Sequence, residues 1–511
     1  MSAAPEPALA HEAGSTPRLA SPRAAAAIFA ALLALPLALP LLWPVPWNAD
    51  LPNHWARLSM LAMPAGDPLN AFYEFKFGVI PNLAMELIYF VLHPLLSPQA
   101  MATLAWALAV VLPATGAWRL SGALHGRPQL AALLAPLSAL NLPVSAGLLN
   151  FAVGMGIMLH ALALWFSVDR RRFWTRLALF NVAGVALFFC HAAAYAAFVL
   201  AIGLIEAAPR RGDAPAAWLR RACQALACVG PPALLWFLAE ALDARVPSAS
   251  SKMLAVFAPF WTGIGASDLV AAGGALAVLC GALLERRLFV EPRLCWALAG
   301  FAALALAIPS GWASGGLLDA RIAISGYFLA LAALRWEWRL RDARVVVPLI
   351  AALCLVRVAL QAPEWRGYDQ KLAEFRAEIA AIEPGGRALV IQGPLDACPQ
   401  DLSFVQNLSA FVAIDRRALV STLFTGAGMQ PLRLRASGDR AIPWTPVQAP
   451  FLMPGAKART PEAAALLQAL GHWRDDYGWI VDLHAECAWR PDALGLTKVA
   501  GGDVADLYRV K

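Results

Sequence analysis

Residues 24–57 read AAAAIFAALLALPLALPLLWPVPWNADLPNHWAR, an apolar run followed directly by a polar one. Residues 24–47 carry no charge and exceed the roughly 20 apolar residues that a membrane-spanning helix needs. A cleaved signal peptide would have a shorter apolar core, so we expect this segment to remain as a spanning helix.

The polar run after this span predicts a second, different helix. If Asp50 caps that helix with Pro52 in its first turn, four polar residues recur at the spacing of one helix face. They are Asp50, Asn53, His54 and Arg57. The alternative is that Asp50 is only a helix cap and Arg57 only a solvated or lipid-headgroup contact.

The composition identifies the broad class. The chain has 511 residues, of which 60% are hydrophobic and 15% charged, whereas an ordinary soluble protein has roughly 25% charged residues. The net charge of +7 does not indicate nucleic-acid binding, because the arginines gather in short segments between apolar runs. We expect a multi-pass membrane protein without a nucleic-acid partner.

Apolar segments of spanning length recur along the first two thirds of the chain. After 24–47 they fall at 99–118, 128–146, 147–168, 174–190, 191–208, 222–242, 267–284, 294–310, 319–335 and 345–361. The sequence therefore predicts a polytopic α-helical membrane protein of about eleven spans.

The turns between these spans alternate in arginine content, which predicts their orientation. Arginine-rich turns are expected in the cytoplasm, and they occur near residues 18–23, 119–127, 170–176, 210–221, 286–293 and 335–344. The N-terminal tail, 1–23, is then cytoplasmic, the membrane domain is 24–361, and the loop 48–98 and the C-terminal part 362–511 lie outside. The Ala- and Arg-rich composition suggests a bacterial inner membrane with these outer parts in the periplasm.

The outer loop 48–98 is long enough to have structure of its own. We expect two interfacial helices in it, the second over LAMELIYFVLHPLL, which is too short to span. Lys76 is a candidate anion-binding residue of this loop, although Lys76 and Glu74 would equally form an ordinary solvated pair.

Polar residues also stand near the predicted outer ends of other spans. Each alone has a structural explanation, such as anchoring or packing. Together they predict one polar chamber that faces outward. They are Asn150, His191, Tyr195, Lys252, Asp319 and Arg321.

Residues 362–511 form a candidate α/β domain, because apolar spans stop there and charge returns. Strand-like runs occur in RALVIQG, GWIVDLHA and VADLYRV, with helical patterns in DQKLAEFRAEIAAIE and PEAAALLQALGHW. Cys398 and Cys487 are its only cysteines, and in an oxidising compartment they are expected to pair as a disulfide. The other six cysteines lie in or beside spans and are expected to be free thiols.

The segments NADLPNHWARLSML (48–61) and GDPLNAFYEFKFGVIPNLAMELI (66–88), with the overall layout, resemble the GT-C superfamily of integral membrane glycosyltransferases. Relatives in that superfamily include the protein mannosyltransferases and the lipid A aminoarabinose transferases. The resemblance implies that a sugar is taken from a polyprenyl-phosphate carrier, and that the loop aspartate, here Asp50, assists the acceptor. The acceptor would be a lipid, a glycan or a protein.

The chemistry of such a transfer requires a base for the acceptor hydroxyl and cations for the leaving phosphate. Asp50 is the candidate base. Four basic residues are candidate phosphate ligands, with arginine suited to bidentate contact: Arg57, Lys76, Lys252 and Arg321. His54 and His191 would donate to the phosphate, or join Asp50 around Mg²⁺ or Mn²⁺, although an Asp50–His54 pair is a weak metal signature.

Three other classes stay open. A transporter of lipid-linked saccharides would also be polytopic with a polar chamber, but it should show internal repeats and charges at mid-membrane depth. A polysaccharide polymerase or ligase is the nearer alternative, usually with its large outer loop between late spans. A non-catalytic assembly protein is a further one.

Overall fold

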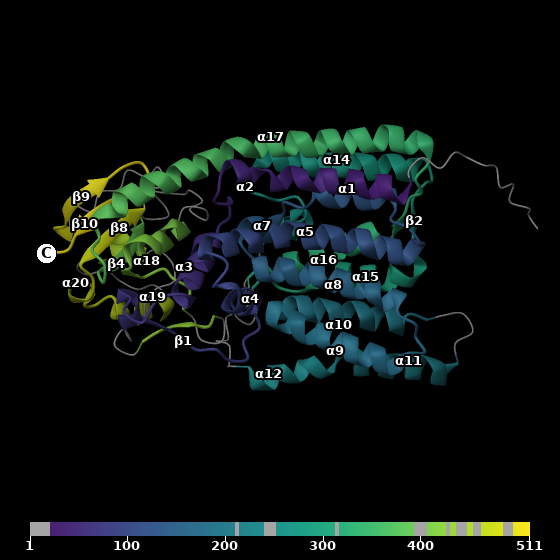
Figure 1. Cartoon of the computed structure of the whole chain (residues 1–511), viewed down its shortest axis with the longest axis horizontal. Helices are drawn as coiled ribbons and strands as arrows, with labels where there is room; N and C mark the ends of the chain where they lie inside the picture. The colour runs from purple at the N-terminus through teal and green to yellow at the C-terminus, as the bar shows by residue number, and fades with distance from the viewer. Residues whose placement is uncertain are drawn as a thin grey trace, which may run out of the picture.

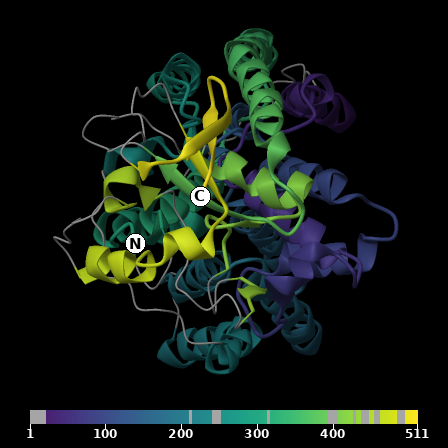
Figure 2. The same cartoon turned by 90° about the vertical axis from the view of Figure 1, so that its left-hand side faces the viewer.

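The computed structural model describes residues 21–209, 214–239, 252–311, 316–392, 406–425, 430–435, 447–452, 461–483 and 494–511. The molecule is elongated, with a bundle of aligned helices that carries a sheet domain at one end (Figure 1). Viewed from that end, the sheet domain lies in front of the bundle (Figure 2). Several of the helices are long and apolar enough to cross a membrane, as expected of a membrane protein.

Five helical segments of the described chain are long and apolar enough to cross a membrane. They are α5 (Pro98–His125), α8 (Leu149–Ser167), α9 (Phe173–Cys190), α14 (Gly265–Leu284) and Arg341–Ala381, which contains nearly all of α17 (Leu340–Glu378). A sixth is counted if α11 (Pro215–Val229) and the bent continuation Pro231–Leu238 form one span. The prediction of about eleven spans is therefore supported only in part.

The remaining bundle helices are shorter. Apolar examples are α1 (Pro22–Leu37), the segment Leu130–Ala146, α10 (Ala192–Ala207) and the segment Pro292–Ala307, which ends in α15 (Cys295–Ala307). The segment Leu130–Ala146 contains α6 (Leu134–Leu137) and α7 (Leu142–Ala146). Other short helices of the described chain are α2 (Leu39–Leu42), α12 (Leu235–Leu238), α13 (Lys252–Phe257) and α16 (Leu318–Ala333).

Prolines explain why three expected spans are interrupted. Proline lacks an N–H and disfavours helical backbone in the residue before it. The first predicted span, 24–47, stops being helical before Pro44 and Pro46, and the third, 128–146, is divided into short helices around Pro136 and Pro143. In the span predicted at 222–242, the chain bends by 51° where Pro231 and Pro232 follow α11.

Glycines bring α5 and α8 into close contact. A Cβ atom at Gly156 would meet Leu112 Cβ at 2.4 Å, and one at Gly116 would meet Leu159 Cβ at 2.7 Å. Small residues at such positions let two membrane helices approach closely. Helices α5 and α8 therefore pack closely against each other within the bundle.

The outer loop 48–98 contains the two predicted helices, α3 (Leu51–Leu61) and α4 (Ala84–Leu92). Between them lie a short 3-10 helix (Pro68–Ala71) and β1 (Tyr73–Phe75). Strand β1 pairs antiparallel with β6 (Leu432–Leu434). The loop is therefore joined to the C-terminal domain and does not lie apart from it.

The C-terminal domain is built on a mixed sheet of strand order β5-β4-β8-β10-β9, with β7 beside β4. Strands β4 (Arg387–Gln392), β5 (Leu419–Val420), β7 (Val447–Gln448) and β8 (Trp479–Leu483) are mutually parallel, and β10 (Ala505–Arg509) is antiparallel to β8 and to β9 (Thr497–Gly501). Its helices are α18 (Ala410–Arg416), α19 (Pro461–Ala469) and α20 (Trp473–Asp476). The three strands and the helices expected from the sequence are all present.

The domain boundary expected at 361/362 falls inside α17, which continues from the bundle into the sheet domain as one helix (Figure 1). The apolar pattern ends near that point, but residues that favour helix continue through LAEFRAE. The change in composition therefore marks where the helix leaves the apolar bundle, not where a new fold begins. Strands β2 (Phe289–Val290) and β3 (Leu334–Arg335) pair at the opposite end of the bundle.

Candidate functional site

The candidate site begins where residues 48–50 pack against the turn before α8. Asn48 is fully buried, and its side chain donates to the carbonyl of Val144 and accepts from the N–H of Leu51 at 2.8 Å. Gly147 has a φ of 85°, and a Cβ there would lie 2.5 Å from Asp50 Cβ and 2.6 Å from Asn48 Oδ1. Only glycine fits this position, because it tolerates both the positive φ and the close approach.

Asp50 occupies the cap position of α3 but does not cap it. Its side chain makes no capping hydrogen bond; instead, its Oδ1 accepts from Asn407 Nδ2 at 3.1 Å. Asn407 also donates to the carbonyl of Ala49 at 2.8 Å and accepts from Asn53 Nδ2 at 2.7 Å. The interpretation of Asp50 as a simple cap is therefore wrong, and the C-terminal domain contacts the candidate base directly.

The surroundings of Asp50 change its acidity. Burial raises the pKa of this carboxyl to about 7, although Arg57, the Asn407 hydrogen bond and Arg321 each oppose that rise. A reference aspartate of pKa roughly 3.9 would be ionised throughout the neutral range. Asp50 is instead half-protonated near neutral pH, where a general acid or base works best.

Arg57 lies one helix turn from His54 and is completely buried. It donates through Nε to Glu86 Oε1 at 2.9 Å and forms an ion pair with that oxygen, which lies 2.8 Å from Nη2. Nη2 itself donates to His54 Nδ1 at 2.6 Å. Glu86, on α4, is equally buried. Among the described residues, Arg57 Nη1 and Glu86 Oε2 have no hydrogen-bond partner. Arg57 is thus a buried ion-pair partner whose charge acts on Asp50, not an exposed headgroup contact.

His54 does not fit the Mg²⁺ or Mn²⁺ site considered with Asp50. Its Nε2 donates to the carbonyl of Gly147 at 2.9 Å, so its Nδ1 accepts from Arg57. Burial and the charge of Arg57 lower the pKa of His54 to about 3, so the ring is neutral. Both ring nitrogens are occupied, and no cluster of three or more metal-ligating side chains occurs in the described part of the chain.

The predicted site residues form a cluster of two halves. The first half is Asp50, His54 and Arg57, at and after the start of α3, and the second half comes from α16 and the α9–α10 turn. Arg321 is 6% exposed, acts electrostatically on Asp50, and places Nη1 2.5 Å from His191 Nε2. The guanidinium also lies 5.4 Å from the centre of the Phe151 ring. His191 caps α10, because its Nδ1 accepts from the N–H of Ala193 at 3.0 Å.

Lys252 and Asp319 form an ion pair next to this half. Lys252 Nζ lies 3.0 Å from Asp319 Oδ2 and also donates to the carbonyls of Ala305 and Ile308. Asp319 is 1% exposed, and the Lys252 side chain is 39% exposed. Arg321, which contacts His191, lies two residues after Asp319 on α16. The structure therefore brings the predicted residues of both halves to one end of the bundle.

Three predicted site residues have other roles. Lys76 pairs with Glu74 at 2.8 Å, with its side chain 65% exposed, so the solvated-pair alternative is correct and Lys76 is not part of the cluster. Asn150 donates to Asn82 Oδ1 at 2.9 Å and accepts from the N–H of Met85, which fixes the start of α4.

Tyr195 is likewise structural, since its hydroxyl donates to the carbonyl of Val229 at 2.7 Å and so joins α10 to α11. The six cysteines expected to be free are free. Cys398 and Cys487 lie outside the described residues, and their disulfide stays a prediction.

Besides Asn48, sequence reasoning missed three residues of the site. Glu86 was detectable as a charge within an otherwise apolar interfacial helix. Gly147 had only the signal of a glycine between two helical patterns. Asn407 had none, because its contact with Asp50 joins positions 357 residues apart.

Comparison with known proteins adds no relative: no protein-family model, curated protein or solved structure matches the chain.

Proposed function

We propose that the chain is a membrane glycosyltransferase of GT-C type, which moves a sugar from a polyprenyl-phosphate donor to a lipid, glycan or protein acceptor. The observation that carries this proposal is the Asp50 carboxyl group. It is partly buried, it makes no capping hydrogen bond to helix α3, and its pKa is about 7 although the charges of Arg57 and Arg321 both lower it.

In the proposed reaction, the Asp50 carboxylate removes the proton from the acceptor hydroxyl. The acceptor oxygen then forms a bond to the anomeric carbon of the sugar, from the face opposite the phosphate. The bond between that carbon and the phosphate oxygen breaks, and its electron pair stays on the phosphate. The configuration at the anomeric carbon is inverted, and Asp50 carries the proton that the acceptor lost.

Arg321 and His191 are suited to hold the leaving phosphate. Because His191 Nδ1 accepts from a backbone N–H, the hydrogen of the neutral ring is on Nε2. Nε2 therefore presents a donor toward Arg321 Nη1, which is also a donor. A phosphate oxygen between them would accept from both and remove this conflict. Lys252 forms an ion pair with Asp319 and is, with Arg321, the second cation of this side.

The proposal includes a topology. The end of the bundle that carries the C-terminal domain would face outward, into the periplasm of a bacterial inner membrane, with the N-terminus inside and about eleven crossings. Its support is the arginine content of the turns at the opposite end. Membrane-embedded polyprenyl-phosphate sugars would then reach Asp50 from the outer leaflet.

The test is donor consumption by the protein in proteoliposomes. The probes are polyprenyl-phosphate-linked hexoses and pentoses, supplied with a bacterial envelope extract as acceptor. Asp50→Asn keeps an oxygen for Asn407 and removes the base, so turnover should fall by roughly 10²–10⁴. Asp475→Asn is the matched control, because that side chain is 82% exposed on α20, and it should retain wild-type turnover.

Wild-type turnover in Asp50→Asn would refute the base role. Translocation of an intact lipid-linked saccharide without any transfer would identify a transporter instead. Joining of whole saccharide repeats, with no activity on single-sugar donors, would identify a polymerase or ligase.

A further inference from the structure

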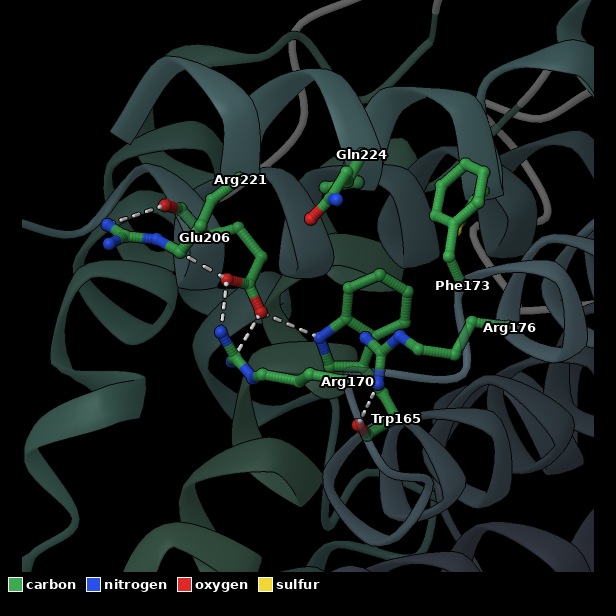
Figure 3. A pocket seen from close by; sticks show the side chains of 9 residues that line it. Trp165, Arg170, Phe173, Arg176, Glu206, Arg221 and Gln224 are labelled. Atoms are coloured by element: carbon green, nitrogen blue, oxygen red, sulfur yellow. Dashed lines mark hydrogen bonds and ion pairs between the residues drawn. The ribbon is translucent and has the colours of Figure 1, made fainter. Parts of the chain in front are cut away.

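A second arginine cluster lines a cavity at the end of the bundle away from the C-terminal domain (Figures 1 and 3). The cavity lies among α8, α9, α10 and α11 and measures about 40 Å³, room for roughly three water molecules. Its polar lining consists of Arg170, Arg176, Glu206, Arg221 and Gln224. None of these residues belongs to the site around Asp50.

The lining is rich in positive charge. Three guanidinium groups face one carboxylate, Glu206, which gives a net charge of +2 (three minus one). Glu206 is 3% exposed, accepts from Arg170 Nη2 at 2.8 Å and accepts from Trp165 Nε1 at 2.9 Å. Arg221 contributes Nε at 3.8 Å from Glu206 Oε2. Glu206 thus holds the arginine side chains of the lining in place.

Arg176 is held rigidly within this lining. Its Nη1 donates to the carbonyls of Trp165 and Val168, both at 3.0 Å, and its guanidinium lies 3.8 Å from the centre of the Trp165 ring. These hydrogen bonds satisfy two carbonyl groups at the C-terminal end of α8 and hold the guanidinium beside the cavity (Figure 3). A preorganised arginine loses little freedom when it binds an anion.

Exposed tryptophans place the cavity at the level of lipid headgroups. Trp174 is 76% exposed at the start of α9, and Trp218 is 40% exposed on α11, with its Nε1 donating to the carbonyl of Ala207. Tryptophan is enriched where a membrane meets water. This end of the bundle also carries the arginine-rich turns and is therefore expected to face the anionic cytoplasmic leaflet.

We propose that this cavity binds the phosphodiester of an anionic phospholipid from the cytoplasmic leaflet. Basic pockets between membrane helices on that side are suited to acidic headgroups. A headgroup of net charge −1 complements the net charge of +2, whereas phosphatidylcholine would bring a cation next to three arginines. The proposal rests on the orientation given with the proposed function, but not on the proposed transfer reaction.

The experiment uses the full-length protein, delipidated in detergent, with phosphatidylglycerol, phosphatidylcholine or inorganic phosphate as the probe. Native mass spectrometry and the thermal midpoint report binding. Phosphatidylglycerol should be retained and should raise the midpoint, and the other two should not. Equal effects of phosphatidylcholine would overturn the charge selection, and equal effects of inorganic phosphate would overturn the lipid assignment.

Variants locate the site. Arg221→Gln should weaken phosphatidylglycerol binding by roughly fivefold or more, and Gln224→Glu, which adds a negative charge without a change of shape, should do the same. Arg171→Gln is the control. Arg171 follows Arg170 in the turn between α8 and α9, but it is exposed and does not line the cavity. Should Arg221→Gln fail to fold, Gln224→Glu decides; binding unchanged in a folded variant overturns the proposal.

Discussion

Replacement of Gly147 by alanine tests how the fold positions Asp50. The new Cβ would lie 2.5 Å from Asp50 Cβ and 2.7 Å from the Asp50 backbone nitrogen, so the segment that carries the candidate base must move. Positive φ adds about 1–2 kcal/mol for a residue with a side chain, and overpacking adds about 1–3 kcal/mol. We expect Gly147→Ala to lower the free energy of unfolding by ~2–5 kcal/mol.

Gly126 provides the matched control. It also ends a helix, has a φ of 79°, and has nothing within 4 Å of the position its Cβ would take. Gly126→Ala should therefore show the backbone cost alone, ~1–2 kcal/mol. The assay compares thermal midpoints of both variants in detergent, together with donor turnover. Equal midpoints in the two variants, or full turnover in Gly147→Ala, would refute the close packing of Asp50 on this turn.

Four further outcomes are expected. The pKa of Asp50 rises from 3.8 to about 7 on folding, so its ionisation destabilises the fold as pH rises through that window, by at most about 4 kcal/mol. The thermal midpoint of Asp50→Asn, measured relative to wild type, should therefore increase from pH 4 to pH 7. Wild-type transfer should increase as pH rises through 7, because the base form of Asp50 accumulates. Glu86→Gln should destabilise by ~3–5 kcal/mol, since it leaves Arg57 buried without its carboxylate, and replacing both residues by methionine should recover much of that loss in the same melting assay. A reporter active only in the cytoplasm, fused to the C-terminus, should be silent, and a signal there would contradict the proposed orientation. Peptide mapping without reduction should recover Cys398 linked to Cys487, and free thiols at both positions would exclude the bond.

The sequence predicted helices well and their interruptions poorly. Apolar runs of about 20 residues are strong signals, because a bilayer core leaves few other solutions for the backbone. α5, α8, α9 and α14 therefore lie close to their expected positions. The errors fall where proline pairs, such as Pro231 and Pro232, divide an apolar run that composition alone treats as continuous.

The site was predictable as a region but not as a set of contacts. Helical spacing correctly grouped Asn53, His54 and Arg57 near Asp50, since spacing is a local property. It misassigned the cap: Asn48, not Asp50, accepts from the N–H of Leu51 at the start of α3. The choice between the two depends on tertiary packing, which no local pattern contains.

The charges around Asp50 offer a reason for its raised pKa in the proposed reaction. Three carboxyl groups and three cationic side chains make up the cluster: Asp50, Glu86 and Asp319 with Arg57, Lys252 and Arg321. A bound phosphodiester adds one negative charge while Asp50 is ionised. After transfer the phosphate has gained a charge and Asp50 has gained a proton, so the total is unchanged. In partly buried surroundings a change in net charge is costly, and a carboxyl group that titrates near neutrality removes that cost within the same step.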